Sequence, residues 1–575
     1  MKRANPKNPL RQRDMGVKHF YLWYKKNFSG CIRKTTEPID TLAIDMNGIF
    51  HSCAQKVYQY GNHATHLLYH QQHALPKSHL TLFREICERI ESLRTQIRPK
   101  KRLVLCVDGV AGIAKMNQQR QRRFKTGLTQ KTQQFDPNGF TPGTKIMDHL
   151  TKYIDWYIRT MITLSPEWQE LEVVFSNEKV PGEGEHKIIS YLKRFAGAND
   201  RICIYGLDAD LMMLGILLPF DHVVIAREPE LGFMEYVDIP VFREELLAML
   251  RWERDFVSDD EPIFSQAVAL HDFVLISFLV GNDFLPTIPT ISILDGAIDT
   301  ILAIYRDVGK TCGHLTETRE RGGVFFRIEA LRRFFTEFGR HEKTMLEQKY
   351  NSQQPFFPDP LVIKNMRLVD QRHVINMEAY KEEFYRTKFG AGVSIAPIVR
   401  DYLRGMAWIL NYYQDGIPDW TWSYPHCYGP FLSDFAACIG QDTGAIAFKT
   451  HEPVPSFLQL MMVLPGGSRD LLPPVLAPLL DRGSVLAPYF PETFEIDMTG
   501  KRKDWEGVVI LPTLSFTAFR SEYERLEKRL SPSEQKRNIV GKNFVYRYDL
   551  TRSDIFSSFY GDIPECPVSV YSIFL

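Results

Sequence analysis

Four short apolar runs recur between residues 41 and 208, with polar or helix-forming sequence between them. They read TLAID, RLVLCVD, LEVVFS and RICIYGLD, and each is rich in aliphatic residues and bounded by polar or Gly signals. Short, continuously apolar runs that alternate with helical patterns are typical of a parallel sheet covered by helices on both faces. We therefore expect an α/β fold, with a mainly parallel sheet flanked by helices, from Leu42 to Asp283.

The pattern changes after residue 310. The segment RIEALRRFFTEFGRHEKTMLEQKY predicts a long helix, residues 378–413 predict more helix, and PSEQKRN opens a late one. We expect four parts: a basic N-terminal tail over 1–14, an α/β domain over 15–310, a helical connector and linker over 311–370, and a second, mostly helical and loop-rich region over 371–575 that packs against the α/β domain.

Composition excludes several classes of protein. The chain has 575 residues, 44% hydrophobic, and a net charge of +1, so the overall charge favours no class of partner. Nine cysteines occur singly, with no CxxC pair, which argues against a zinc site of Cys type and against a secreted disulfide framework. No apolar run reaches membrane-spanning length. We expect an intracellular monomer, in cytoplasm or nucleus, that is not bound to a membrane.

Carboxylates follow the apolar runs. Because the carboxyl ends of parallel strands meet at one edge of a sheet, we expect these side chains to cluster there and to repel one another. Divalent cations relieve such repulsion, and oxygen-only ligation suits Mg²⁺ or Mn²⁺, with two ions as the expected number. The alternative is that each acid caps the helix after its strand. The set is Asp45, Asp108, Glu183, Glu185, Asp208, Asp210 and Asp283.

A basic helix is predicted directly after the second of these runs. In KMNQQRQRRF, the spacing places Lys115, Gln119, Arg122 and Arg123 on one helical face. Eleven Lys or Arg and a single acid occur from Arg94 to Lys131. Lys and Arg are the usual ligands of phosphate, and the stripe adjoins Asp108, so we expect it to bind a phosphate that is not itself attacked. The alternative is a solvated basic face.

Together these motifs resemble the Xrn-type 5′→3′ exoribonucleases, in order and spacing, from Met15 onward. The resemblance is carried by MGVKHFYLWY, LAIDMNGIFHSC, CVDGVAGIAKMNQQRQRRF, VPGEGEHKI, GLDADLMMLG, LVGNDFLPTIP, GMAWILNYYQDGIPDWTWSYPHCYGPFLSDF, LQLMMVLPGGSRDLLP and DWEGVVILP.

The resemblance implies a catalytic core like that of PIN and flap nucleases, completed by the second region. It implies processive hydrolysis of single-stranded RNA with a 5′-monophosphate, such as decapped mRNA, to nucleoside 5′-monophosphates. The seven acids match the family's metal ligands, and Lys115, Gln119, Arg122 and Arg123 match its pocket for the terminal phosphate. His51 matches a residue that stacks on the first base. Trp420 or Trp422 resembles the stacking partner on the other side of that base.

The chain departs from the family pattern in four places. Gly112-Ile113 stands where the family usually has Pro-Arg, MGVKHF lacks the family's Pro after Val, fourteen residues precede Met-Gly-Val, and the chain ends soon after the second block of family motifs. We therefore expect a compact member without long C-terminal extensions, which would suit a virus-encoded enzyme acting in host cytoplasm. His63, His66, His70 and His73 are interpreted as a polar helix face. The competing functions are a structure-specific flap-type nuclease and an inactive RNA-binding scaffold.

Overall fold

The computed structural model describes residues 20–574, except 62–74, 77, 128–134, 231, 254–263, 294–295, 320–322, 353–356, 441–442, 444–445 and 502–505. The N-terminal tail and the tract from His63 to His73 lie outside the described residues. Within them the fold is mixed α/β, with a mainly parallel central sheet and a largely helical second region, which confirms the predicted class. No helix in this described part is long and apolar enough to cross a membrane.

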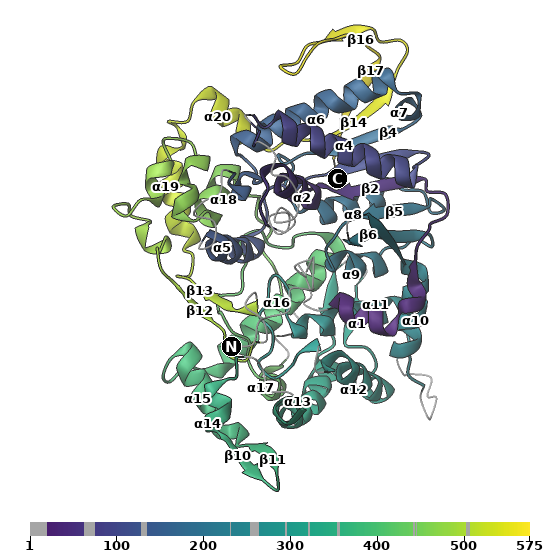
Figure 1. Ribbon diagram of the computed structural model, residues 1–575. Helices are drawn as coiled ribbons and strands as arrows, with labels where there is room; N and C mark the ends of the chain where they lie inside the picture. Colours follow the sequence, from purple (N-terminus) through teal and green to yellow (C-terminus); the bar gives the residue numbers. More distant parts are fainter. Residues whose placement is uncertain are drawn as a thin grey trace, which may run out of the picture.

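One large sheet organises the molecule (Figure 1). Nine of the described strands form it, and the five at its centre, β6-β5-β2-β3-β4, run parallel, whereas both edges are antiparallel. In spatial order the strands are β1 (Ile32–Arg33), β7 (Phe233–Asp238), β6 (Val223–Glu230), β5 (Ile202–Tyr205), β2 (Thr41–Asp45), β3 (Arg102–Cys106), β4 (Glu172–Ser176), β14 (Asn543–Tyr548) and β17 (Val568–Ile573).

Both faces of the sheet are buried, which explains why its central strands are continuously apolar. Leu42 and Ile44 of β2 pack into a core with three helices on one face, whereas Ala43 belongs to the core on the other face. The first face is covered by α2 (Met46–Tyr58), α4 (Leu80–Ile97) and α6 (Lys145–Leu164). The second is covered by α8 (Gly184–Phe195), α9 (Asp210–Ile216), α10 (Ile239–Leu250) and α11 (Gln266–Ser277).

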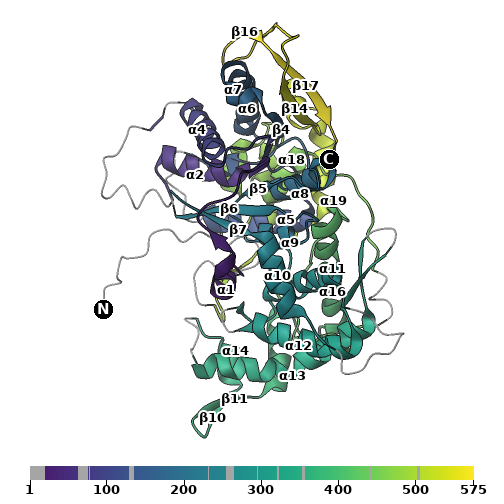
Figure 2. The ribbon, with the colours of Figure 1, turned by 90° about the vertical axis from the view of Figure 1, so that its right-hand side faces the viewer.

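The second region continues the core of that second face (Figures 1 and 2). The long helix α13 (Ile328–Ser352), in the expected connector, confirms the first predicted helix. The helical stretch expected over 378–413 is two helices, α15 (Met377–Phe389) and α16 (Ile395–Asp415), because Gly390 and Gly392 between them adopt positive φ of 102° and 73°. The late helix, α20 (Pro532–Arg537), begins after a Ser531 capping box, as its sequence predicts.

The remaining elements complete the outline. The other helices are α1 (Phe20–Asn27), α5 (Ile113–Gly127), α7 (Pro166–Gln169), α12 (Ala297–Cys312), α14 (Pro360–Lys364), α17 (Leu432–Cys438), α18 (Ser456–Val463) and α19 (Phe516–Glu527). The two-stranded sheets pair β8 (Thr316–Thr318) with β9 (Val324–Phe326), β10 (Met366–Val369) with β11 (Arg372–Ile375), β12 (Glu495–Asp497) with β13 (Val508–Ile510), and β15 (Asp554–Phe556) with β16 (Ile563–Cys566).

Two strands from the end of the chain finish the main sheet. β14 pairs antiparallel with β4, placing Tyr546 opposite Val173, and β17 then pairs with β14. The sheet that carries the predicted acids is therefore built from both ends of the sequence.

Candidate active site

The predicted acids gather at the carboxyl edge of the parallel strands. Asp45 is the last residue of β2, and Asp108 and Asp208 follow β3 and β5 closely. Six of the seven acids line one cavity of about 1770 Å³. They are Asp45, Asp108, Glu183, Glu185, Asp208 and Asp283. The seventh, Asp210, is buried at the first residue of α9.

The structure distinguishes these acids from ordinary helix caps. Asp45 and Glu183 do occupy the N-cap positions of α2 and α8, but within the described chain neither side chain accepts a capping hydrogen bond. The Oδ1 atom of Asp45 and the Oε2 atom of Glu185 are buried without a hydrogen-bond partner among the described residues. Buried carboxylate oxygens in this state favour a cationic ligand.

Asp108 is held from two directions. Asn47 Nδ2 donates to its Oδ2 atom at 2.8 Å, and the backbone N–H of Gly184 donates to its Oδ1 atom at 2.7 Å. Gly184 is required for space, since a Cβ there would lie 2.5 Å from Asp45 Oδ1. The approach of α8 to the ends of β2 and β3 therefore brings Glu183 and Glu185 into the cluster.

Crowding disfavours the ionised forms of these acids. Burial, then the charges of Asp108 and Asp208, raise the pKa of Asp45 well above its usual range. Burial and Asp210 do the same to the pKa of Glu185. Burial raises the pKa of Asp208 to about 6 against the opposing field of Lys115. An all-oxygen set with this excess of negative charge fits Mg²⁺ or Mn²⁺ by its donor chemistry.

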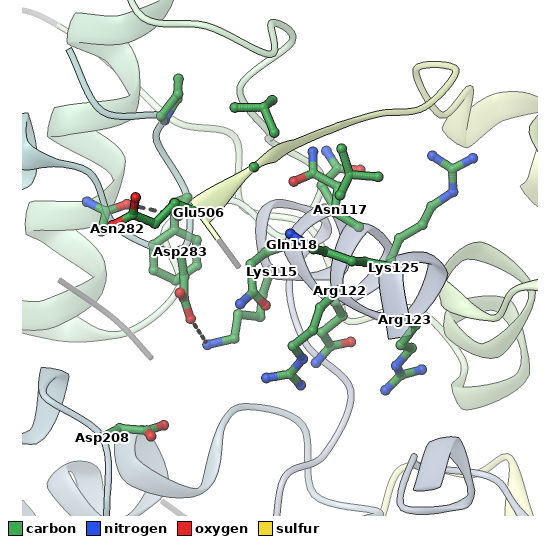
Figure 3. Close-up of a pocket in the computed structure, with 18 of the residues that line it drawn as sticks. Lys115, Asn117, Gln118, Arg122, Arg123, Lys125, Asp208, Asn282, Asp283 and Glu506 are labelled. Carbon is green, nitrogen blue, oxygen red and sulfur yellow. Dashed lines mark hydrogen bonds and ion pairs between the residues drawn. The ribbon is translucent and has the colours of Figure 1, made fainter. Parts of the chain in front are cut away.

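Lys115 supplies positive charge to the acid cluster. Lys115 Nζ forms an ion pair with Glu183. It forms another with Asp283, at 2.7 Å, which Figure 3 shows. Burial opposes the charge of Lys115, but Asp283 and Glu183 outweigh it and raise the pKa of Lys115. Among the described residues, no group of three or more His, Cys, Asp or Glu is arranged closely enough to hold a metal ion as it stands.

The basic stripe is helical, as predicted, and faces the same cavity. Lys115, Gln119, Arg122 and Arg123 all line it from α5, and Figure 3 shows Lys115, Arg122 and Arg123 on one side of the helix. Arg123 is buried, and its Nη1 atom has no hydrogen-bond partner in the described part of the chain. Burial and the charge of Arg122 lower the pKa of Arg123 to about 9. A buried guanidinium in this state favours a bound anion.

Arg120 belongs to the same sequence motif but has a different role. Its guanidinium donates to the backbone carbonyls of Pro512 and Tyr489, at 3.0 and 2.6 Å. It therefore ties α5 to the second region through both terminal nitrogens, although the side chain lines the cavity and its Nε atom has no hydrogen-bond partner among the described residues.

The residues expected to stack on a base are placed differently from one another. His51 lines the cavity and meets the Phe140 ring edge-on, with centroids 5.2 Å apart. Neither Trp420 nor Trp422 is among the described residues that line the cavity. The Trp422 ring stacks on Trp408 at 5.2 Å, and the Trp420 carbonyl accepts from the Ile113 N–H at 2.9 Å. The stacking role of either tryptophan stays a prediction.

The replacement of Pro-Arg by Gly112-Ile113 affects packing. Ile113 is buried in an apolar cluster with Met116, Phe457 and residues of α19, and neither Gly112 nor Ile113 is among the described residues that line the cavity.

Sequence reasoning missed three residues that organise the site. Asn47 bonds to Asp108 through both its amide atoms, and its place two residues after Asp45 was a usable signal. Arg227, on β6, donates to the Leu207 carbonyl at 2.5 Å beside Asp208. Tyr412, on α16, donates to Glu183. The last two come from distant elements, so the local sequence carries no sign of their contacts.

Comparison with known proteins matches two family profiles to the chain. The profile described as the XRN 5′-3′ exonuclease N-terminus matches residues 15–134 and 126–229. The profile described as the Xrn1 helical domain matches residues 264–378 and 364–560. Together they contain every acid of the cluster and the whole basic stripe.

Curated relatives align with nearly the whole chain. 5′-3′ exoribonuclease 1 of Saccharomyces cerevisiae is 26% identical over 96% of this chain and 46% of the relative. The corresponding figures are 28%, 92% and 72% for 5′-3′ exoribonuclease 2 of Gallus gallus, and 29%, 95% and 36% for 5′-3′ exoribonuclease 1 of Homo sapiens. The chain thus spans about half the length of the yeast relative and about a third of the length of the human one. A solved structure of the catalytic core of Rad2 with DNA substrate matches 65% of the chain with 17% identity and a TM-score of 0.28, which is too low to support an argument.

Proposed function

Because the chain belongs to the Xrn family of 5′-3′ exonucleases, we propose that it hydrolyses single-stranded RNA from a 5′-monophosphate end. The products are nucleoside 5′-monophosphates. The observation that carries this proposal is that a carboxylate cluster and a partly buried cationic stripe line a single cavity, joined by Lys115. Such a cavity can bind one phosphate at the cationic stripe while the next phosphodiester is cleaved at the carboxylate cluster.

The stripe binds the terminal phosphate. Arg123 supplies a buried guanidinium, and Gln119 and Arg122 line the cavity beside it. Holding the terminal phosphate on α5 sets the register of the chain, so that the next phosphodiester faces the acids. Each cut leaves a new 5′-monophosphate, which is the substrate of the next cycle, so hydrolysis is processive. A cap or a triphosphate is too bulky for this pocket.

The acids hold the divalent ions. We assign that role to Asp45, Asp108, Glu183, Glu185, Asp208, Asp210 and Asp283, with two Mg²⁺ or Mn²⁺ ions. When bound, the ions activate water and neutralise charge that develops on the phosphate oxygens. The buried oxygens of Asp45 and Glu185 that have no partner among the described residues support this assignment. Lys115, which pairs with Glu183 and Asp283 here, would be available to phosphate where those two carboxylates held the ions.

The first base lies against His51, with Trp420 or Trp422 as its second neighbour. Aromatic faces hold any base without reading its edge, so degradation does not depend on sequence. We propose that the protein acts as a monomer inside the cell, in cytoplasm or nucleus, and that decapped mRNA is its substrate. The nine free cysteines support a reducing compartment.

The test uses one RNA sequence with a monophosphate, a hydroxyl or a triphosphate at its 5′ end. Each RNA is incubated with Mg²⁺ and the wild type, Asp208→Asn or Asp307→Asn. Asp307 is the matched control, because its side chain is 76% exposed on α12 and ion-paired to Lys310. We expect mononucleotides from the monophosphate RNA alone, with wild type and Asp307→Asn but not with Asp208→Asn.

Other outcomes separate the alternatives. Equal attack on all three ends would retain the nuclease and reject the phosphate pocket. Internal cleavage next to a flap would favour a structure-specific nuclease. RNA binding without cleavage of any end would favour the inactive scaffold.

A further inference from the structure

Helix α16, from the second region, reaches into the acid cluster. Tyr412 on this helix is buried, and its hydroxyl donates to Glu183 Oε1 at 2.7 Å. The other oxygen of the same carboxylate, Oε2, forms the ion pair with Lys115. Glu183 is therefore held from two sides, by a neutral donor from α16 and by a cation from α5. Its Oε2 atom is the one turned toward the stripe.

The position of the Tyr412 hydroxyl is fixed by the rings around it. Its ring stacks on the imidazole of His186, with centroids 3.7 Å apart and planes 12° apart. The rings of Trp408 and Phe284 pack against it at 5.2 and 5.7 Å. Because His186 lies one turn from Glu183 on the same helix, the ring and the hydroxyl together bind one short segment of α8 to α16.

Core packing accounts for the ring but not for the hydroxyl. A phenylalanine would fill the same volume, whereas a buried hydroxyl needs a partner and therefore restricts what lies opposite. The same helix offers a comparison. Tyr402, also buried on α16, donates to the backbone carbonyl of Pro286 at 2.9 Å and touches no acid of the cluster by this bond.

We propose that Tyr412 is a positioning residue: it orients the Glu183 carboxylate so that Oε2 faces the ions and the substrate. This inference rests on the proposed function and extends it to α16. It also explains why the nuclease sheet is accompanied by the helical region, since that region supplies a hydrogen bond to an acid of the cluster. Partners of this kind fix the direction of a ligand's lone pairs, and losing one costs about 10–100-fold in metal affinity or activity.

The experiment compares Tyr412→Phe and Tyr402→Phe in the full chain. Mn²⁺ binding to the protein without RNA is measured by electron paramagnetic resonance, and kcat and KM are measured on 5′-monophosphate RNA at saturating Mg²⁺. Thermal melts check folding. We expect Tyr412→Phe to weaken Mn²⁺ binding about 10–100-fold, or to lower kcat by that factor, with KM for RNA unchanged. Tyr402→Phe should match the wild type in both measurements.

A double variant tests whether Tyr412 acts through Glu183. If it does, Tyr412→Phe should have no further effect on Mn²⁺ binding in a Glu183→Gln background. Additive effects would overturn the proposal, and so would a Tyr412→Phe protein with wild-type Mn²⁺ binding and kcat. Failure of Tyr412→Phe to fold, where Tyr402→Phe folds, would assign the hydroxyl to the core and overturn it as well. A wild type that degrades no RNA would reject the proposed function, while the Mn²⁺ comparison would still decide the role of Tyr412.

Discussion

Asp108 and Gly184 are joined by a 2.7 Å hydrogen bond from the Gly184 N–H to the Asp108 carboxylate. The bond connects the loop after β3 to the first turn of α8, and so to Glu183 and Glu185 on either side of the glycine. The same glycine leaves space for the Asp45 carboxylate. The end of β2, the loop after β3 and the start of α8, which all carry acids, therefore meet at Gly184.

Gly184→Ala should abolish most of the activity. The added Cβ would lie 2.5 Å from Asp45 Oδ1, so the carboxylate or the helix must move. A displacement of about 1 Å at a reacting centre costs about 100-fold in rate. The measurement is kcat on 5′-monophosphate RNA. Gly483→Ala is the control, since among the described atoms nothing lies within 4 Å of a Cβ at that position. Full activity of Gly184→Ala would show that the cluster tolerates rearrangement.

Arg123→Ala and Arg120→Ala should affect different properties, although the two residues lie only three positions apart. Removing Arg123 should reduce the preference for monophosphate over hydroxyl ends about 10–100-fold, since a hydrogen bond to a charged group contributes about 1.5–3 kcal/mol. Stability should change little, because Arg123 Nη1 is buried without a partner in the described chain. Removing Arg120 breaks its bonds to two carbonyls and should lower the free energy of unfolding by about 1.5–3 kcal/mol, with the end preference intact.

The measurements for this pair are competition between the two RNA ends and urea unfolding. If Arg120→Ala lost the preference and Arg123→Ala retained it, the roles within the motif would be reversed.

Without divalent ions, the ionisation of Asp208 should lower the stability of the protein as pH rises. The pKa of this acid is raised to about 6 in the folded protein, against about 3.9 in an unfolded chain. Between these values the folded state holds an extra proton, so raising the pH through the window lowers the free energy of unfolding. Asp208→Asn removes this contribution. In EDTA, the free energy of unfolding of the variant should rise relative to that of the wild type by at most about 3 kcal/mol between pH 4 and pH 7.5. A tenfold change in proton affinity equals about 1.4 kcal/mol.

Urea unfolding at the two pH values measures that difference. Adding Mg²⁺ at pH 7.5 should stabilise the wild type more than Asp208→Asn, because the ion binds the charged cluster in the folded state. A gap that does not change with pH would contradict the raised pKa.

His51→Ala should raise KM for RNA without abolishing cleavage. The side chain lines the cavity and packs edge-on against Phe140, so its loss removes a surface for the base. Stacking contributes about 1–3 kcal/mol per base, which corresponds to about a 5- to 150-fold change. Steady-state kinetics on homopolymers of each base would measure it. His222→Ala, an exposed position before β6, is the control, and an equal effect there would remove the stacking role.

Local patterns in the sequence were sufficient for the strands, the basic helix and the gathering of the acids, because these depend on short-range periodicity and on the parallel order of strands. They did not indicate the ion pairs that Lys115 forms with Glu183 and Asp283, and its role toward phosphate stays a prediction. Nor did they indicate the contact of Tyr412 with Glu183. Such contacts join residues more than sixty positions apart, and only the packing of whole helices brings them together.

The pairing of β14 with β4 affects how the protein is made. A growing chain leaves the ribosome N-terminus first, so β4 emerges early and then has an open edge while the entire helical region is synthesised. Open strand edges recruit other strands and favour aggregation. The late arrival of β14 and β17 closes that edge. Nascent chains that stall before residue 543 should therefore require chaperones, and the nuclease sheet is completed only after the whole helical region has been synthesised.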